Sequence, residues 1–193
     1  PAFYPGGRTI EAILFDTLLD AKIRPEFICA GRRLFYAEFI AAFAANIKNG
    51  GFSVRPCPGS IELVNALIAQ DDLVLGLLTG NHQKTAELKL AAAGYDLASF
   101  KIGAYGQEAV DRALLVGLAK DRAFKQVGVH FEPQEIVVLG DTTRDVMAAK
   151  DAGVRNIAVT TGTDDYDMLK ACKPDFLFED FEETQAVFNA ILG

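Results

Sequence analysis

Two aspartates that follow an apolar run stand at a spacing that suits metal binding. Residues 136–139 (IVVL) are followed at once by residues 140–145 (GDTTRD), which hold Asp141 and Asp145. A turn can bring both carboxylates toward one point, and such hard oxygen ligands suit Mg²⁺, which retains waters and a substrate phosphate. We therefore predict a magnesium site at Asp141 and Asp145. The alternative is that both aspartates only cap a helix, a position that Asp favours.

A second polar turn, Thr79-Gly80-Asn81, follows residues 73–78 (LVLGLL), which form another apolar run. A hydroxyl and free backbone N–H groups at the start of a helix form an anion site. The same residue types also favour simple capping turns. Because this turn and GDTTRD follow strands predicted to lie in one sheet, we predict that Thr79, Gly80 and Asn81 bind phosphate.

One basic residue, Arg112, stands at the start of a helix predicted for residues 111–127. A guanidinium there could neutralise phosphate or hold a carboxylate in place. Taken alone, Arg112 is better interpreted as a solvated surface charge. His82 follows the Thr79 turn and could touch a substrate, although a surface position at a helix start is the simpler interpretation.

From residue 56 onward, short apolar runs alternate with amphipathic segments. Strands are predicted at residues 73–78, 100–105, 136–139, 156–160 and 176–178, with helices between them and a closing helix at 182–192. The alternation indicates an α/β fold, a Rossmann-like parallel sheet with helices on both faces. Continuous apolar runs such as LVLGLL are typical of strands buried on both faces. Ligand sites in such sheets lie outside the carboxyl ends of the strands, where the polar turns described above stand.

Before residue 56 the sequence predicts helices alone. Residues 9–21 and 32–48 have apolar side chains at helical spacing, and glycines at 50 and 51 end the second segment. We therefore predict two parts, a small helical module at residues 1–55 and an α/β core at residues 56–193.

Composition excludes several classes of protein. The chain has 193 residues, half of them apolar and 23% charged, as expected for a globular enzyme. The formal net charge of −7 makes nucleic acids and anionic membrane surfaces poor partners. Its three cysteines are widely spaced and predict reduced thiols. No apolar run reaches the ~18 residues of a membrane span and no signal peptide is visible, so we expect a cytoplasmic protein.

The order of these motifs resembles motifs two, three and four of the haloacid dehalogenase (HAD) superfamily. The matching segments are LTGN at 78–81, a basic residue at a helix start, and VVLGDTTRDVMAAKDAG at 137–153. The front helices resemble that family's helical cap. GGRT at 6–9 and PCPG at 56–59 resemble the branch related to phosphoglycolate phosphatase.

The resemblance implies a role for each matching residue. Thr79 would hydrogen-bond the transferring phosphoryl group, assisted by Gly80 and Asn81 through the loop. Arg112 would take the place of the basic residue of motif three. Arg8, on the cap, would either reach the substrate or serve the structure.

The cofactor that the resemblance implies is Mg²⁺, bound directly by Asp141 and either directly or through water by Asp145. The implied partner is a small, phosphoglycolate-like phosphomonoester. No nucleic-acid or membrane partner is implied, and the oligomeric state stays open.

The family's first motif, a buried strand ending in DxDGT, has no match in the sequence. That motif supplies the aspartate nucleophile and the general acid–base. The nearest candidate is residues 14–20 (LFDTLLD), in which Asp16 is either a degenerate nucleophile or part of a helix. The apolar stripe through Ile10, Ile13, Leu14 and Leu18 favours the helix.

By the same resemblance, the missing strand would lie between residues 73–78 and 136–139, at the centre of the sheet. Unpaired buried backbone groups cost ~1–3 kcal/mol each, so a gap there is expensive. The sequence begins at Pro1, and we expect the natural protein to have an upstream strand with the nucleophile, unless another segment or chain fills the gap.

We therefore predict a magnesium-dependent phosphomonoester hydrolase. One alternative is hydrolysis of a 2-haloacid, a chemistry that needs no metal and leaves the GDTTRD carboxylates unexplained. Another is a non-catalytic protein of the same fold that retains a phosphate or metal site.

Overall fold

The computed structural model describes residues 6–193, so the first five residues of the predicted helical module lie outside it. The helices are α1 (Ile10–Asp20), α2 (Pro25–Lys48), α3 (Ser60–Ile68), α4 (Gln83–Ala92), α5 (Ala113–Val127), α6 (Thr143–Asp151), α7 (Tyr166–Ala171) and α8 (Thr184–Leu192). The strands are β1 (Gly76–Thr79), β2 (Ile102–Tyr105), β3 (Val137–Gly140), β4 (Arg155–Val159) and β5 (Phe176–Phe178). Short 3₁₀ turns occur at Leu97–Ser99 and Pro133–Glu135.

All strand pairs are parallel, which confirms the predicted α/β fold. They form two sheets, one of β1 and β2 and one in the order β3-β4-β5. No backbone pairing joins β1 to β3 within residues 6–193. Each of these two strands therefore has one edge without a hydrogen-bonded neighbour.

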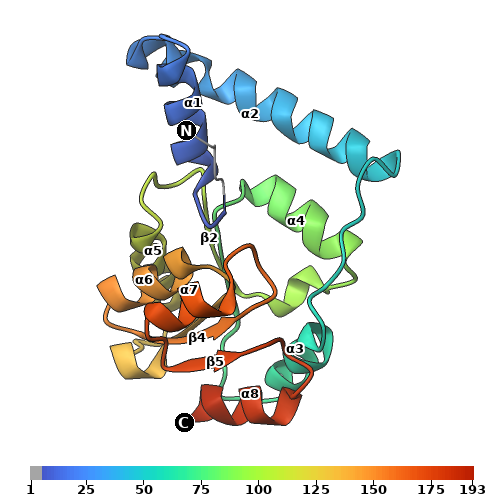
Figure 1. The fold of residues 1–193 in the computed structure, drawn as a ribbon, viewed down its shortest axis with the longest axis vertical. Coiled ribbons are helices and arrows are strands. Elements are labelled where there is room, and N and C mark those ends of the chain that lie inside the picture. The colour runs from blue at the N-terminus through green and yellow to red at the C-terminus, as the bar shows by residue number, and fades with distance from the viewer. Residues whose placement is uncertain (1–5) are drawn as a thin grey trace.

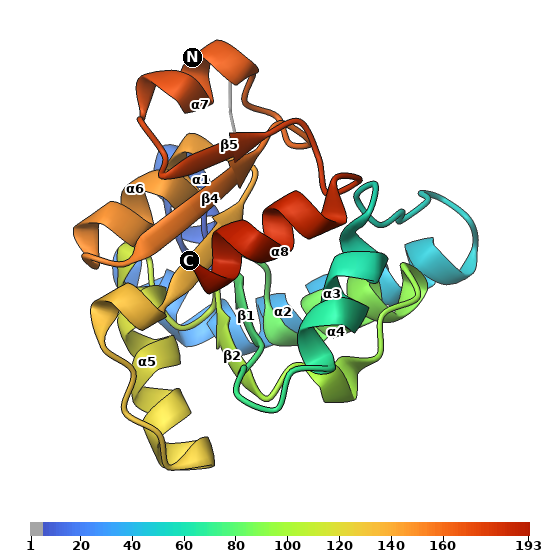
Figure 2. The same cartoon turned by 90° about the horizontal axis from the view of Figure 1, so that it is seen from below.

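Helices cover both faces of the strands. On one side α3 and α8 pack side by side (Figure 2), and Leu63 and Val187 bury their side chains with Leu139 of β3. On the other side Val116 of α5 and Ala149 of α6 pack on Val138 of β3. Leu78 of β1 joins this second cluster, so apolar contacts link the two sheets although hydrogen bonds do not.

Burial differs between the strands. β4 lies between β3 and β5, and its residues Ile157 and Val159 are each only 2% exposed. Residues 73–78, in contrast, contain no buried side chain, and β1 begins only at Gly76. The expectation that this run is buried on both faces is met only in part, because its leucines pack against apolar clusters on both faces but none is fully buried.

The N-terminal segment is helical, as predicted. Thr9 caps α1, its hydroxyl oxygen accepting from the Ala12 N–H at 3.1 Å. Residues 14–20 lie within α1 and Asp16 is exposed, so this stretch is a helix and not a strand with a degenerate nucleophile. α2 is two turns longer than predicted because Pro25 opens it, and proline suits the first helical position.

α1 and α2 lie at one end of the molecule, and α8 with the C-terminus lies at the other (Figure 1). Within residues 6–193 no helix combines the length and the apolar character that crossing a bilayer requires.

Candidate functional site

A cavity of about 320 Å³ lies where the loops after β1 and β3 meet the start of α1. Ligand sites in proteins begin at about this size. The cavity brings together all the residues that the sequence predicts for the site: Arg8, Thr79, Gly80, Asn81, Arg112, Asp141 and Asp145. Ile10, Ile13, Phe39, His82 and Thr142 complete its lining, with Gly7.

The hydroxyl of Thr79 is prepared to act as a donor. Its oxygen accepts from the Asn81 backbone N–H at 3.2 Å and from Asn81 Nδ2 at 2.9 Å. Lys89 Nζ in turn donates to Asn81 Oδ1 at 2.8 Å, which fixes the orientation of the amide. A hydroxyl has one proton and two lone pairs, so the Thr79 proton is left for another acceptor.

Arg112 and Asp145 form a buried ion pair. Arg112 Nη2 contacts Asp145 Oδ1, and the two side chains are 14% and 5% exposed. Arg112 Nη1 also donates to the Gly7 carbonyl at 3.1 Å. Its Nε is buried and has no acceptor within residues 6–193, a state that costs free energy. The interpretation of Arg112 as a solvated surface charge is therefore wrong.

Asp145 both caps α6 and faces the cavity. Its Oδ2 accepts from Thr142 N–H at 3.1 Å and from Thr142 Oγ1 at 2.7 Å. The capping alternative thus holds for Asp145 without excluding a place in the site. Asp141, half-buried, makes no ion pair within the described chain. Burial, together with the negative charge of Asp145, raises the pKa of the Asp141 carboxyl.

These two carboxylates decide how a metal would fit. No group of three or more His, Cys, Asp or Glu side chains gathers within residues 6–193. Mg²⁺ needs only one or two carboxylates when substrate oxygens and waters complete its shell. Both Asp145 oxygens are engaged by Arg112 and Thr142, so Asp145 suits contact through water, whereas Asp141 is the carboxylate that remains for direct ligation.

The start of α1 is held against the loops after β1 and β2. Ile10 N–H donates to the Gly80 carbonyl at 2.7 Å, and Glu11 N–H donates to the Gly106 carbonyl at 3.2 Å. A Cβ on Gly80 would lie 2.1 Å from the Arg8 carbonyl oxygen, so only glycine allows this approach. The glycine that was predicted for phosphate binding therefore also closes the cavity.

Two polar side chains of the lining, Thr142 and His82, are not among the site residues predicted from the sequence. Thr142 and Asp145, three residues apart, form a capping box at the start of α6. This spacing is visible in the sequence and is the signal that could have identified Thr142. His82 is at a helix start as expected, accepting from Lys84 N–H at 3.1 Å, but it is half-buried and its ring lies 4.8 Å from that of Tyr36. Burial lowers the pKa of His82.

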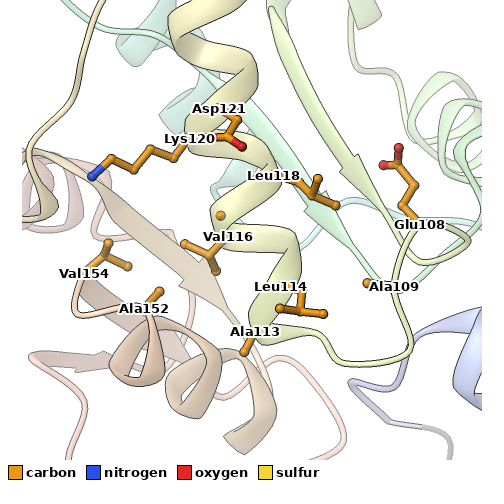
Figure 3. A pocket seen from close by; sticks show the side chains of 11 residues that line it. Glu108, Ala109, Ala113, Leu114, Val116, Leu118, Lys120, Asp121, Ala152 and Val154 are labelled. Atoms are coloured by element: carbon orange, nitrogen blue, oxygen red, sulfur yellow. The ribbon is translucent and has the colours of Figure 1, made fainter.

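A larger hollow of about 540 Å³ runs beside α5 (Figure 3). Its walls include Leu114, Val116 and Val154, and the charged side chains at its rim are Glu108, Lys120 and Asp121. None of the site residues predicted from the sequence lines this hollow, so the volume of a cavity does not by itself identify the functional site.

Comparisons with known proteins agree with this geometry. Residues 111–184 match the model of the HAD-hydrolase-like family. The chain is 40% identical over 183 residues to "Probable phosphatase IndB" of Dickeya dadantii, an alignment that covers 92% of this chain and 73% of that protein. It is 32% identical over 124 residues to the phosphoglycolate phosphatase of Synechococcus elongatus, covering 63% of this chain. The match spans about half, 54%, of the Synechococcus protein.

Among solved structures, a hydrolase from Pseudomonas syringae superposes with a TM-score of 0.69 at 19% identity. The match covers 96% of this chain and 80% of that one, which supports the fold. With the parallel strands and the relatives above, it follows that the chain belongs to the HAD-like hydrolase family.

Proposed function

We propose that the protein is a magnesium-dependent phosphomonoester hydrolase that acts on a small phosphorylated metabolite. The observation that carries this proposal is the meeting of Thr79, Arg112, Asp141 and Asp145 in one cavity at the carboxyl ends of β1 and β3. The names of the relatives support phosphoester hydrolysis, and their family membership supports Mg²⁺ as the cofactor.

The side chains divide the work of holding a phosphoryl group. The free proton of Thr79 donates to one oxygen, and Arg112 Nε, which lacks an acceptor, suits another. Gly80 and Asn81 supply the loop that shapes this end of the cavity. Asp141 would hold Mg²⁺ directly and Asp145 through water, and the ion would neutralise charge on the phosphoryl oxygens.

The nucleophile belongs, in this proposal, to a strand between β1 and β3 that the described residues do not supply. Its aspartate would attack phosphorus in line, and the bond from phosphorus to the leaving alcohol oxygen would break. Water would then cleave the acyl phosphate, releasing phosphate and regenerating the carboxylate. The unpaired edges of β1 and β3 support this placement.

The division of the chain is part of the same proposal. Residues 1–55 would act as a cap that limits water at the reacting centre, over an α/β core at residues 56–193. Arg8, at the junction, would face the substrate from the cap side. We further propose a cytoplasmic location.

The test is turnover of p-nitrophenyl phosphate by the full-length protein with Mg²⁺, repeated with EDTA. We expect hydrolysis that EDTA abolishes and that added Mg²⁺ restores. Absence of EDTA-sensitive turnover, on this ester and on a panel of physiological phosphomonoesters, would contradict the proposal.

A further inference from the structure

The cavity has two chemically different ends. Thr79, Arg112 and Asp141 are gathered at the loops after the strands. The wall contributed by the front helices is apolar, with Ile10 and Ile13 from α1 and Phe39 from α2. A phosphoryl group held at the polar end leaves the rest of its ester against this apolar wall.

Arg8 also lines the cavity, and it is the cation that could bind a negatively charged leaving group at the apolar end. Its guanidinium is already engaged, because Nη2 contacts the Asp16 carboxylate and lies 3.3 Å from the Ala12 carbonyl. The other cation in the lining, Arg112, is paired with Asp145. A carboxylate on the leaving group would therefore meet two cations that already have carboxylate partners, and it would have to share Arg8 with Asp16.

His82 adds no positive charge to this end. Its ring lies against Tyr36, and burial lowers its pKa, so it is neutral at pH 7. A neutral imidazole beside Phe39 and two isoleucines forms a wall that favours flat or apolar groups. Placing an unpaired carboxylate against it would cost the ion its hydration.

Resting on the proposed hydrolase function, we propose that the substrate is a phosphomonoester of an uncharged alcohol with an apolar or aromatic surface. Because Asp16 already offsets the charge of Arg8, and the remaining wall is apolar, the cavity favours a leaving group without a carboxylate. Hydrolysis would release phosphate and the neutral alcohol.

The experiment compares phenyl phosphate with 2-phosphoglycolate on the full-length protein with Mg²⁺. We measure kcat/KM for turnover and, separately, affinity by calorimetric titration. We expect phenyl phosphate to be favoured at least about tenfold in both measurements, a difference typical of one mismatched group in a site.

Two matched variants of α1 sharpen the comparison. Asp16→Asn removes the charge that occupies Arg8, and Asp16 is 59% exposed on its side chain, so folding should be unaffected. We expect this variant to raise kcat/KM for 2-phosphoglycolate by about threefold, the scale of one exposed ion pair, and to leave phenyl phosphate unchanged. Asp20→Asn, an exposed position on the same helix, should change neither substrate.

The outcomes separate this inference from the proposed function. Turnover of 2-phosphoglycolate as efficient as that of phenyl phosphate would overturn the inference while leaving the hydrolase intact. Selective binding of phenyl phosphate without turnover would support the inference and contradict the hydrolase. Failure of both esters to bind would overturn both, and an Asp16→Asn variant with unchanged selectivity would remove the Arg8–Asp16 pair as its cause.

Discussion

Arg112 and Asp145 tie together the two sheets of this molecule. Arg112 lies after β2 at the start of α5, and Asp145 lies after β3 in the first turn of α6. Their ion pair is buried and contacts the cavity in which the other site residues meet. The same contact that positions a candidate metal ligand therefore also joins the two sheets, between which no backbone hydrogen bonds run within residues 6–193.

Replacing Arg112 should weaken the fold as well as the site. Arg112→Met leaves Asp145 buried without its cation, and breaking such a pair costs about 3–5 kcal/mol. We expect that loss in the free energy of unfolding, measured by urea denaturation at pH 7. The control is Arg24→Met, whose exposed pair with Glu26 should be worth about 1 kcal/mol or less. Equal losses in the two variants would contradict this account.

Lys89 should act on phosphate through Asn81. Lys89→Met removes the donor that orients the Asn81 amide, so Thr79 loses a defined direction for its proton. We expect the affinity for inorganic phosphate, measured by calorimetry, to fall about tenfold, the effect of one charged hydrogen bond. Lys84→Met, on the exposed side of the same helix and paired with Glu87, should leave the affinity unchanged. Similar losses in both variants would point to net charge instead of amide orientation.

Replacing Gly80 and replacing Gly117 by alanine should have opposite effects on the stability of the fold. In Gly80→Ala the new methyl group would meet the Arg8 carbonyl and separate α1 from the loop after β1, so we expect destabilisation and loss of phosphate binding. Gly117 lies in the interior of α5 with open space around it, so Gly117→Ala should stabilise the protein by about 0.5–1 kcal/mol. Thermal unfolding measures both, and a stable Gly80→Ala protein with normal binding would contradict the described approach of α1.

His82 should make the fold sensitive to mild acid. Its pKa is lowered by burial, and Lys84 lowers it further while Glu87 opposes this. The unfolded chain therefore takes up the proton first, so the stability that neutral His82 contributes is present above pH ~6.5 and lost as pH falls through its folded-state pKa.

The measurement is the urea midpoint between pH 7.5 and pH 5 for the natural protein and for His82→Asn. Asparagine keeps a helix-capping side chain but cannot titrate, so the variant should lose less stability over this range. Parallel pH profiles for the two proteins would show that another group is responsible.

The sequence was sufficient to predict most of the helices and strands, and to predict that the site residues lie close together. Apolar runs ending in polar turns located β1 and β3, and the carboxyl ends of parallel strands placed Thr79 and Asp141 in one cavity. Contacts between segments that are distant in the chain could not be predicted from the sequence. Arg112 taken alone reads as a surface charge, because nothing in its own helix shows that Asp145 will cover it.

The extent to which each strand is buried could not be predicted from the local sequence pattern either. The run at residues 73–78 has the composition of a central strand, yet none of its side chains is buried, whereas Ala104 of the neighbouring β2 is fully buried. The apolar wall depends likewise on how α1 and α2 approach the core, which Phe39 and Ile13 at helical spacing do not reveal.

Calorimetric titration of inorganic phosphate in the presence of Mg²⁺ tests the central claim most directly. We predict one saturable site per chain whose affinity falls at least about tenfold when Mg²⁺ is withheld or in Asp141→Asn, with Asp167→Asn on α7 as the unaffected control. Phosphate binding that is absent, or that neither Mg²⁺ nor Asp141→Asn alters, would contradict a shared phosphate-and-magnesium cavity.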